Sequence, residues 1–231
     1  RAVRAGGVRL QGRLVNGTLS LGALDRLLPK STGAPFRLPD IDLSLEDARL
    51  RFDTPFGQLG GKLDGQGSLQ GGFEGKLALV APRLARDATC GATNVTVYGD
   101  LSVVGRRPTF KGPVRFSEFA CGKMSGKAAD IGLDASIADD MADWRGKSAV
   151  RLMSSAMPGV KISGIEAQVD FRGDARKTDA DVDILFGSLA AADMTASRIR
   201  LSGKTTLGAR GSIFSGQVHA ARIFTGGLTK K

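Results

Sequence analysis

Apolar and polar residues alternate along most of the chain, and the pattern is clearest between Leu59 and Leu79. Every odd position of this stretch is Leu, Phe or Gly, whereas the even positions are mainly Lys, Asp, Gln, Ser and Glu. Successive side chains of a β-strand point to opposite faces, so the period of two predicts strands with one apolar and one polar face. The stretch is too long for one typical strand, and a hairpin turn is expected near Gly71-Gly72.

Similar runs follow one another along the chain. Apolar residues two positions apart define them at 41–45, 48–52, 95–103, 131–137, 165–171 and 182–186. The phase slips at Glu46-Asp47, which predicts a bulge or a turn, and Gly203-Lys204 is expected to separate two strands. A leucine cluster before Pro29 favours one short helix over residues 21–28. No linker divides residues 1–231, so we predict one repetitive, all-β, domain-like unit.

Strands with one apolar face can close on one another as a β-sandwich or barrel, or they can line an open trough. Two features favour the trough. The chain has only one Trp and one Tyr, which are the residues that usually fill a sandwich core. Glycine also recurs on the apolar face, where it adds no packing area but permits strong twist and the close approach of another molecule to the backbone. A closed β-sandwich, with these glycines at bulges and bends, is the alternative.

Positive charge is concentrated at both ends of the chain. There are 33 Lys and Arg against 23 Asp and Glu, a net charge of +10. Residues 1–37 hold seven basic residues and one acid, residues 198–231 hold seven and none, and the middle holds 19 and 22. These ends fit either an anionic partner, such as nucleic acid or phospholipid headgroups, or solvated strand faces. Specific nucleic-acid binding is not expected, because aromatic stacking platforms are missing.

The first half of the chain also carries short motifs in a recognisable order. They are Gly7–Gly12, Gly17–Gly22, Leu24–Pro29, Phe36–Ile41 and Thr54–Gly57. In this order they resemble the AsmA-like superfamily, in particular its YdbH branch. The cadence of Leu63–Leu69 is typical of the whole superfamily, which includes TamB. The resemblance covers residues 6–125, and the remainder shares only the period of two.

This resemblance implies an elongated, twisted, antiparallel β-groove, sometimes called a β-taco. Members of the superfamily are anchored in the inner membrane of Gram-negative bacteria and extend through the periplasm. They are thought to conduct phospholipids to the outer membrane, with the acyl chains shielded in the apolar groove. The chain would be a segment of such a protein without its N-terminal anchor, and neither an enzyme nor a cofactor protein. The alternative function is an envelope scaffold or assembly factor that pairs exposed strand edges with partner proteins.

The same resemblance implies that the apolar positions of the strands line the groove. They are Leu43, Leu45, Leu50, Phe52, Leu59, Leu63, Leu69, Phe73, Leu77, Val95, Val97, Ile131, Leu133, Ile165, Val169, Val182 and Ile184. The alternative for each of them is a place in a closed core. No bond is broken in lipid conduction, so such a groove needs no catalytic group.

Few other residues point to chemistry. Cys90 and Cys121 are too far apart in the sequence for a CxxC redox pair. In the oxidising periplasm that the resemblance implies they would form a disulfide, and the alternative is two buried thiols. The D-x-D-x-D motif at Asp179–Asp183 lacks the Gly and Glu of an EF-hand loop, which indicates a solvated strand face. His219 has no evident partners, so neither a catalytic nor a metal site is predicted.

Overall fold

The described part of the chain folds into a single β-sheet. A computed structural model describes residues 2–15, 18–20, 37–140, 142–208 and 211–225. These residues contain no helix and form the strands β1 (Ala2–Gly6), β2 (Arg9–Val15), β3 (Thr18–Ser20), β4 (Asp42–Thr54), β5 (Gly57–Ser68), β6 (Phe73–Asp87), β7 (Cys90–Val104), β8 (Arg107–Cys121), β9 (Met124–Ile137), β10 (Asp143–Met157), β11 (Val160–Asp174), β12 (Lys177–Ala191), β13 (Met194–Gly208) and β14 (Gly211–Thr225). The predicted all-β fold is confirmed, while the short helix expected over residues 21–28 lies outside the described residues.

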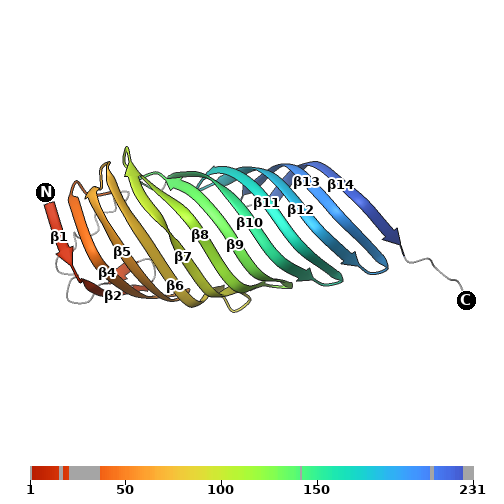
Figure 1. Ribbon diagram of the computed structural model, residues 1–231, viewed down its shortest axis with the longest axis horizontal. Helices are drawn as coiled ribbons and strands as arrows, with labels where there is room; N and C mark the ends of the chain where they lie inside the picture. Colours follow the sequence, from red (N-terminus) through yellow and green to blue (C-terminus); the bar gives the residue numbers. More distant parts are fainter. Residues whose placement is uncertain (1, 16–17, 21–36, 141, 209–210, 226–231) are drawn as a thin grey trace, which may run out of the picture.

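From β4 to β14 the strands lie side by side in chain order, and each neighbouring pair is antiparallel. At the other edge β1 and β2 run parallel to β4, and β3 pairs with β2. The sheet is elongated and twisted and does not close into a barrel (Figure 1). The described strands all belong to this one sheet, so the alternative of a closed β-sandwich is wrong.

Local sequence explains where two of the irregularities fall. The turn expected near Gly71-Gly72 is present, because β5 ends at Ser68 and β6 begins at Phe73. The phase slip expected at Glu46-Asp47 is a bulge, where the register between β4 and β5 shifts between Leu45 and Ala48. Asp47 has a φ of 48°, a left-handed conformation that short polar side chains tolerate.

The prediction of a turn at Gly203-Lys204 is wrong. Both residues lie inside β13, and Gly203 pairs with Gly216 of β14. A Cβ on Gly216 would lie 2.8 Å from the Gly203 Cα, so only glycine allows the two strands to approach this closely. The glycines mark a close strand contact here rather than the end of a strand.

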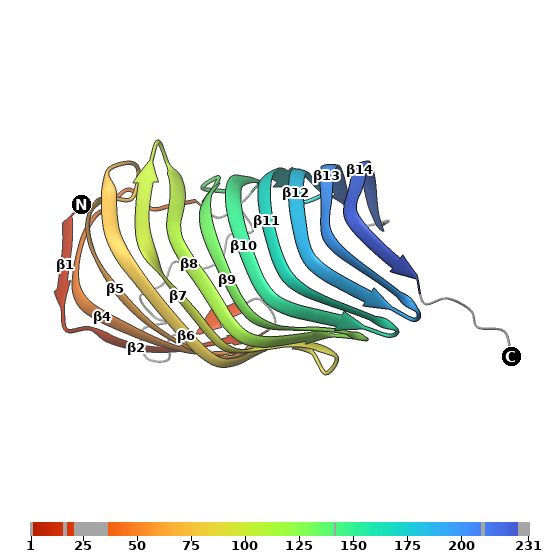
Figure 2. The ribbon, with the colours of Figure 1, turned by 45° about the vertical axis from the view of Figure 1, so that its right-hand side comes forward.

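The strands from β6 onward curve along their length (Figure 2). From β7 to β14 one exposed residue per strand forms a line across the sheet, which we call the corner row: Asn94, Ser117, Ala128, Met153, Gly164, Gly187, Arg198 and Ala221. In alternate strands its residue has a positive φ, as Ala128 does at 52° and Gly164 at 61°. We call the segments beyond this row, such as 154–157 and 160–163, the short arm, and the remainder of β7–β14 the long arm.

The alternation slips at the corner row. On β11, going toward the short arm, the half-buried Ile165 is followed by the exposed Gly164 and Ser163 and then by the half-buried Ile162. In β8, β9 and β12, too, two consecutive exposed residues lie between more buried ones at the corner row. Two consecutive exposed residues fit on the outside of a bend, so the apolar face lies on its inner side. The slip keeps one face apolar through the bend, because apolar residues on both sides of it point inward.

Candidate functional site

Side chains of β4–β14 form continuous apolar rows on one face of the sheet. Residues paired across a sheet point to the same side, so the register identifies the members of each row. The longest row runs through Leu10, Leu50, Gly61, Leu79, Val97, Val114, Ile131, Val150, Ala167, Ile184, Leu201 and Val218. Parallel rows lie on both sides of it, and together they form what we call the apolar face.

The register places the predicted groove residues together. Leu50, Val97, Ile131 and Ile184 belong to the longest row, and the other strand residues of the candidate set fall on the same face. Leu69 is the exception, because it lies in the turn between β5 and β6 and donates its backbone N–H to the Ile41 carbonyl. Contact of these residues with lipid stays a prediction.

The apolar face is much less exposed than the polar face. Val103, on the apolar face, is 4% exposed, whereas its chain neighbour Val104 is 71% exposed. Phe73 and Ala129 on the apolar face are also buried. No second layer covers this face within the described residues, so the burial comes from neighbouring side chains on the same face. A sheet bent toward its apolar face crowds those side chains together.

Sequence reasoning missed the apolar residues of β8 and β10, and it named no groove residue on β13 or β14, where Leu201 and Val218 continue the longest row. Phe110, Val114 and Phe116 of β8 alternate in the sequence, but Pro108 and Pro113 argue against a strand in the middle of a sheet. On β10, Val150 and Leu152 are next to the apolar residues Ala149 and Met153, which hide the alternation, and only pairing with β9 and β11 reveals their row. The inward-facing residues of the short arm were missed too, because no local sequence signal predicts that the alternation of faces shifts by one residue at Ala128 and Arg198.

Several aromatic rings on the apolar face occupy the space beside a glycine that a side chain would need. A Cβ on Gly65 would lie 2.6 Å from Cζ of Phe73, and one on Gly203 would lie 3.0 Å from Cζ of Phe214. The Phe119 ring covers Gly126 in the same way. At Gly65 we expected a backbone that another molecule could approach closely, but the Phe73 ring occupies that space instead.

The polar face carries a ladder of charges that alternate in sign except where Asp170 faces Asp181. Its members, in register from β5 to β13, are Asp64, Lys76, Asp100, Lys111, Asp134, Lys147, Asp170, Asp181 and Lys204. Lys76 lies 2.7 Å from Asp100, and this carboxylate raises the pKa of Lys76. Exposed ion pairs contribute at most about 1 kcal/mol each, so the ladder specifies register more than it stabilises the sheet.

Among the described residues, three basic side chains from the ends of the chain pair with acids on neighbouring strands. Arg9 forms a 2.8 Å ion pair with Asp47, Lys204 faces Asp181, and Arg200 pairs with Asp183. The Asp179–Asp183 motif is therefore engaged with cations on an exposed strand face. Within the described residues, no cluster of His, Cys, Asp and Glu has the arrangement of a metal site.

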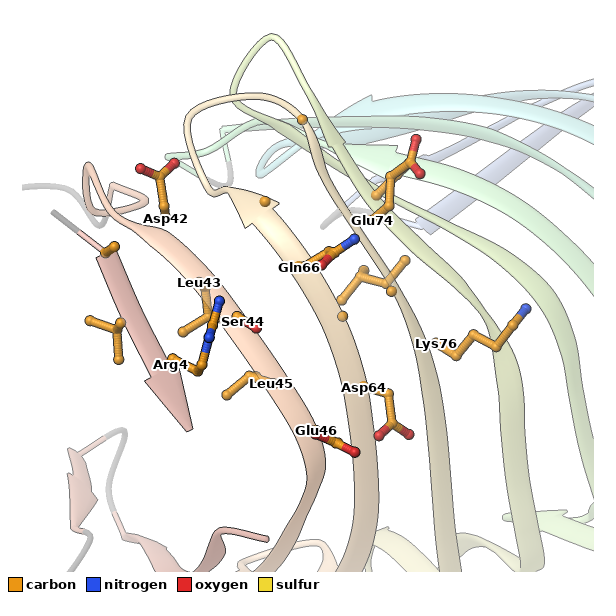
Figure 3. Close-up of a pocket in the computed structure, with 18 of the residues that line it drawn as sticks. Arg4, Asp42, Leu43, Ser44, Leu45, Glu46, Asp64, Gln66, Glu74 and Lys76 are labelled. Atoms are coloured by element: carbon orange, nitrogen blue, oxygen red, sulfur yellow. The ribbon is translucent and has the colours of Figure 1, made fainter. Parts of the chain in front are cut away.

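A hollow of about 1210 Å³ lies on the polar face over β1 and β4–β7 (Figure 3). A twisted sheet curves in two directions, so a hollow can form on this face as well. Its charged residues are Arg4 and Lys76 against Asp42, Glu46, Asp64, Glu74 and Asp100. The excess of carboxylates makes this hollow unsuitable for an anionic ligand.

Cys90 and Cys121 pair across β7 and β8 and are joined by a disulfide. They are the last inward-facing residues of the short arm on these strands. His219 lies exposed on β14, with Nε2 3.4 Å from the Gln217 Oε1.

The apolar face is long as well as continuous. Eleven neighbouring strands, β4–β14, spaced about 4.8 Å apart give it a length of about 50 Å, more than the roughly 30 Å hydrocarbon core of a bilayer. Within the described residues, the structure contains no helix with the length and apolar character needed to cross a membrane. Comparisons of the chain with protein-family models, with curated proteins and with solved structures returned no match.

Proposed function

We propose that this chain is a segment of a lipid-conducting groove, related to the AsmA-like superfamily that its motifs resemble. The observation that carries the proposal is the apolar face, which runs unbroken across β4–β14 in a sheet that stays open. Phospholipid acyl chains would lie on this face while the headgroups stay in water. The expected setting is the periplasm of a Gram-negative bacterium, between an inner-membrane anchor and the outer membrane.

The proposed mechanism is physical rather than chemical. Each acyl methylene kept from water saves about 0.8 kcal/mol, so a lipid can leave a bilayer only along a path that stays apolar. The longest row offers such a path, since an apolar residue or glycine occupies each of its positions from β4 to β14. No proton, electron or bond has to move.

A pair of neighbouring substitutions tests the proposal. Val97 lies in the middle of the longest row, whereas Thr96 is exposed on the polar face of the same strand. We expect the purified wild-type chain to carry phospholipid in native mass spectrometry. Val97→Asp should lose the bound lipid, because a carboxylate on the acyl path must be desolvated. Thr96→Asp adds the same charge to the other face and should retain it.

Circular dichroism of both variants checks that the sheet is intact. Absence of phospholipid from the wild-type chain would contradict the proposal, and so would equal lipid content in the two variants.

The strand β14 favours a second candidate function. It pairs with β13 on one side only within the described residues, and its 15 residues are all exposed, including Ile213 and Phe224. Such an edge can accept a strand from a partner protein, as in an envelope scaffold or assembly factor. Partner capture that persists in Val97→Asp would favour this function over lipid conduction.

A further inference from the structure

The two rims of the bent sheet differ in chemistry. On the short-arm side the inward-facing residues end in what we call the methionine rim: Cys90, Cys121, Met124, Met157, Val160, Ala191 and Met194. Met124, Met157 and Met194 are 41%, 40% and 38% exposed at the tips of three successive hairpins. Thioether side chains are flexible and apolar, so this rim can adapt to chains that cross it.

The opposite rim carries ion pairs. At the hairpin ends of the long arm, Arg106 pairs with Asp139 at 2.9 Å and Arg107 pairs with Asp143 at 2.7 Å. An acyl chain crossing this rim would have to pass ion pairs. One crossing the methionine rim at the β10–β11 hairpin would pass Met157, Pro158, Gly159 and Val160, none of which is charged, while Lys123 and Asp193 lie in the turns of the two neighbouring hairpins. The methionine rim is therefore the favourable side for tails to reach the apolar face.

The outer face of the same short arm has the chemistry of a phosphate site. A hollow of about 340 Å³ lies there, and its polar lining residues include Ser125, Lys127, Ser154, Lys161, Ser163 and Ser188, while Ala156, Ile162 and Ala190 add apolar surface. No acid belongs to its lining, in contrast to the hollow over β1 and β4–β7. Among the described residues Lys161 makes no ion pair, while Lys127 lies 3.6 Å from Glu118 at the margin. Two ammonium groups and a set of hydroxyls are suited to an oxyanion.

The tail surface and the phosphate site lie on opposite faces of one hairpin. Met157 pairs with Val160 at the tip of β10 and β11, and both point inward. Lys161 is the next residue and points outward, opposite Ala156. A lipid lying across this tip would place its tails on the methionine rim and its phosphate beside Lys161. The geometry matches the division of a phospholipid into apolar tails and an anionic head.

We propose that phospholipids load sideways, over the methionine rim at β9–β12, while Lys127, Lys161 and the neighbouring serines hold the headgroup phosphate. This inference rests on the proposed function and assigns its loading site. It places loading along the side of the sheet rather than at the end of the row of strands.

The test follows transfer of a phospholipid with a fluorescent acyl chain from phosphatidylglycerol vesicles to the 231-residue chain. The headgroup variant is Lys127→Gln with Lys161→Gln. Its matched control, Lys111→Gln with Lys147→Gln, removes the same charge from the polar face of the long arm. We expect the headgroup variant to load about tenfold more slowly, because each lysine near an anionic lipid contributes a several-fold effect, and the control to stay within about twofold of wild type.

The rim variants separate tails from headgroups. Met124→Asp with Met157→Asp should slow loading by about tenfold or more, because carboxylates then stand where acyl methylenes must cross. Met124→Leu with Met157→Leu keeps the rim apolar and should load like wild type. Both positions are about two-fifths exposed, so the sheet should tolerate the changes, and circular dichroism verifies this.

The outcomes are distinguishable. If the wild-type chain takes up no lipid, the proposed function fails and the loading site fails with it. If the wild type loads and every variant loads at its rate, sideways loading is overturned while the proposed function stands. An effect of the lysine variant alone, with the methionine variants unaffected, would mean that the hollow binds phosphate without loading tails, and this too overturns the proposal.

Discussion

At the scale of the residue, the corner row shows how single positions shape the groove. Gly164 has a φ of 61°, and a Cβ placed there would lie no closer than 3.6 Å to its neighbours. Space is therefore available at this position, and only the backbone conformation disfavours a side chain. At Gly132 a Cβ would also be accommodated, 3.8 Å from the nearest atom, and φ is ordinary. Comparing alanine substitutions at these two glycines therefore distinguishes the effect of backbone strain from the effect of packing.

We expect Gly164→Ala to lower the free energy of unfolding by about 1 kcal/mol, because L-residues pay roughly this cost in the left-handed region. Gly132→Ala should leave it unchanged or raise it by about 0.5–1 kcal/mol, because alanine loses less backbone entropy on folding. Urea unfolding of the two variants measures the difference. Equal effects would mean that the bend does not depend on the left-handed conformation at Gly164.

At the scale of the element, the bulge at Asp47 connects the N-terminal strands to the sheet. The Asp47 carboxylate accepts a hydrogen bond from Arg9 of β2 at 2.8 Å and one from Arg49 of β4 at 3.2 Å. Its backbone N–H donates to Asp64 of β5 at 2.7 Å. One bulged residue thus joins three strands, including a parallel pair that no hairpin turn holds together.

The attachment of β2 should weaken in acid. Hydrogen bonds from Arg9 and Arg49 lower the pKa of Asp47 from 3.8 to about 2. A lowered folded-state pKa gives stability that is present above about pH 4 and is lost as the pH falls through about 2. The protection factors of the β2 amides, which are corrected for the intrinsic exchange rate at each pH, should therefore fall over this range in the wild type. In Asp47→Asn the β2 amides should already be weakly protected at neutral pH. The neighbouring variant Glu46→Gln should behave like the wild type. If neither substitution changes the protection of β2, the role of Asp47 is refuted.

At the scale of the whole molecule, the sheet is a one-dimensional array. Each strand from β5 to β13 contacts the strand before it and the strand after it, and no second layer bridges distant strands within the described residues. The stability of such an array is the sum of local terms and nearest-neighbour contacts. The Cys90–Cys121 disulfide stabilises only the β7–β8 hairpin directly.

Protection from amide exchange should follow this architecture. Within β4–β14 we expect the slowest exchange in the central strands β7–β12 and the fastest in β14, which pairs with one strand among the described residues and has no buried residue. Exchange resolved by mass spectrometry of peptic fragments tests this gradient. Uniform protection from β4 to β14 would show instead that the sheet unfolds as a single cooperative unit.

The sequence was most informative where local pattern alone decides structure. The period of two between Leu59 and Leu79, the turn at Gly71-Gly72 and the slip at Glu46-Asp47 all appear as expected. Prediction from the sequence failed where the pairing between strands decides the structure. Nothing near Gly203 distinguishes a strand-to-strand contact from a turn, and the difference lies in Gly216 on the next strand.

The sequence by itself determined that the protein is built from strands with one apolar and one polar face, because the period of two is a property of each strand alone. Only the tertiary structure decided that these faces form one open, bent sheet. Register aligns apolar residues from distant parts of the chain into rows, and left-handed residues such as Ala128 turn those rows through the bend. Register and bend depend on contacts between strands, which no single stretch of sequence contains. The methionine rim and the serine-lined hollow exist only because that bend gives the short arm an inner and an outer side.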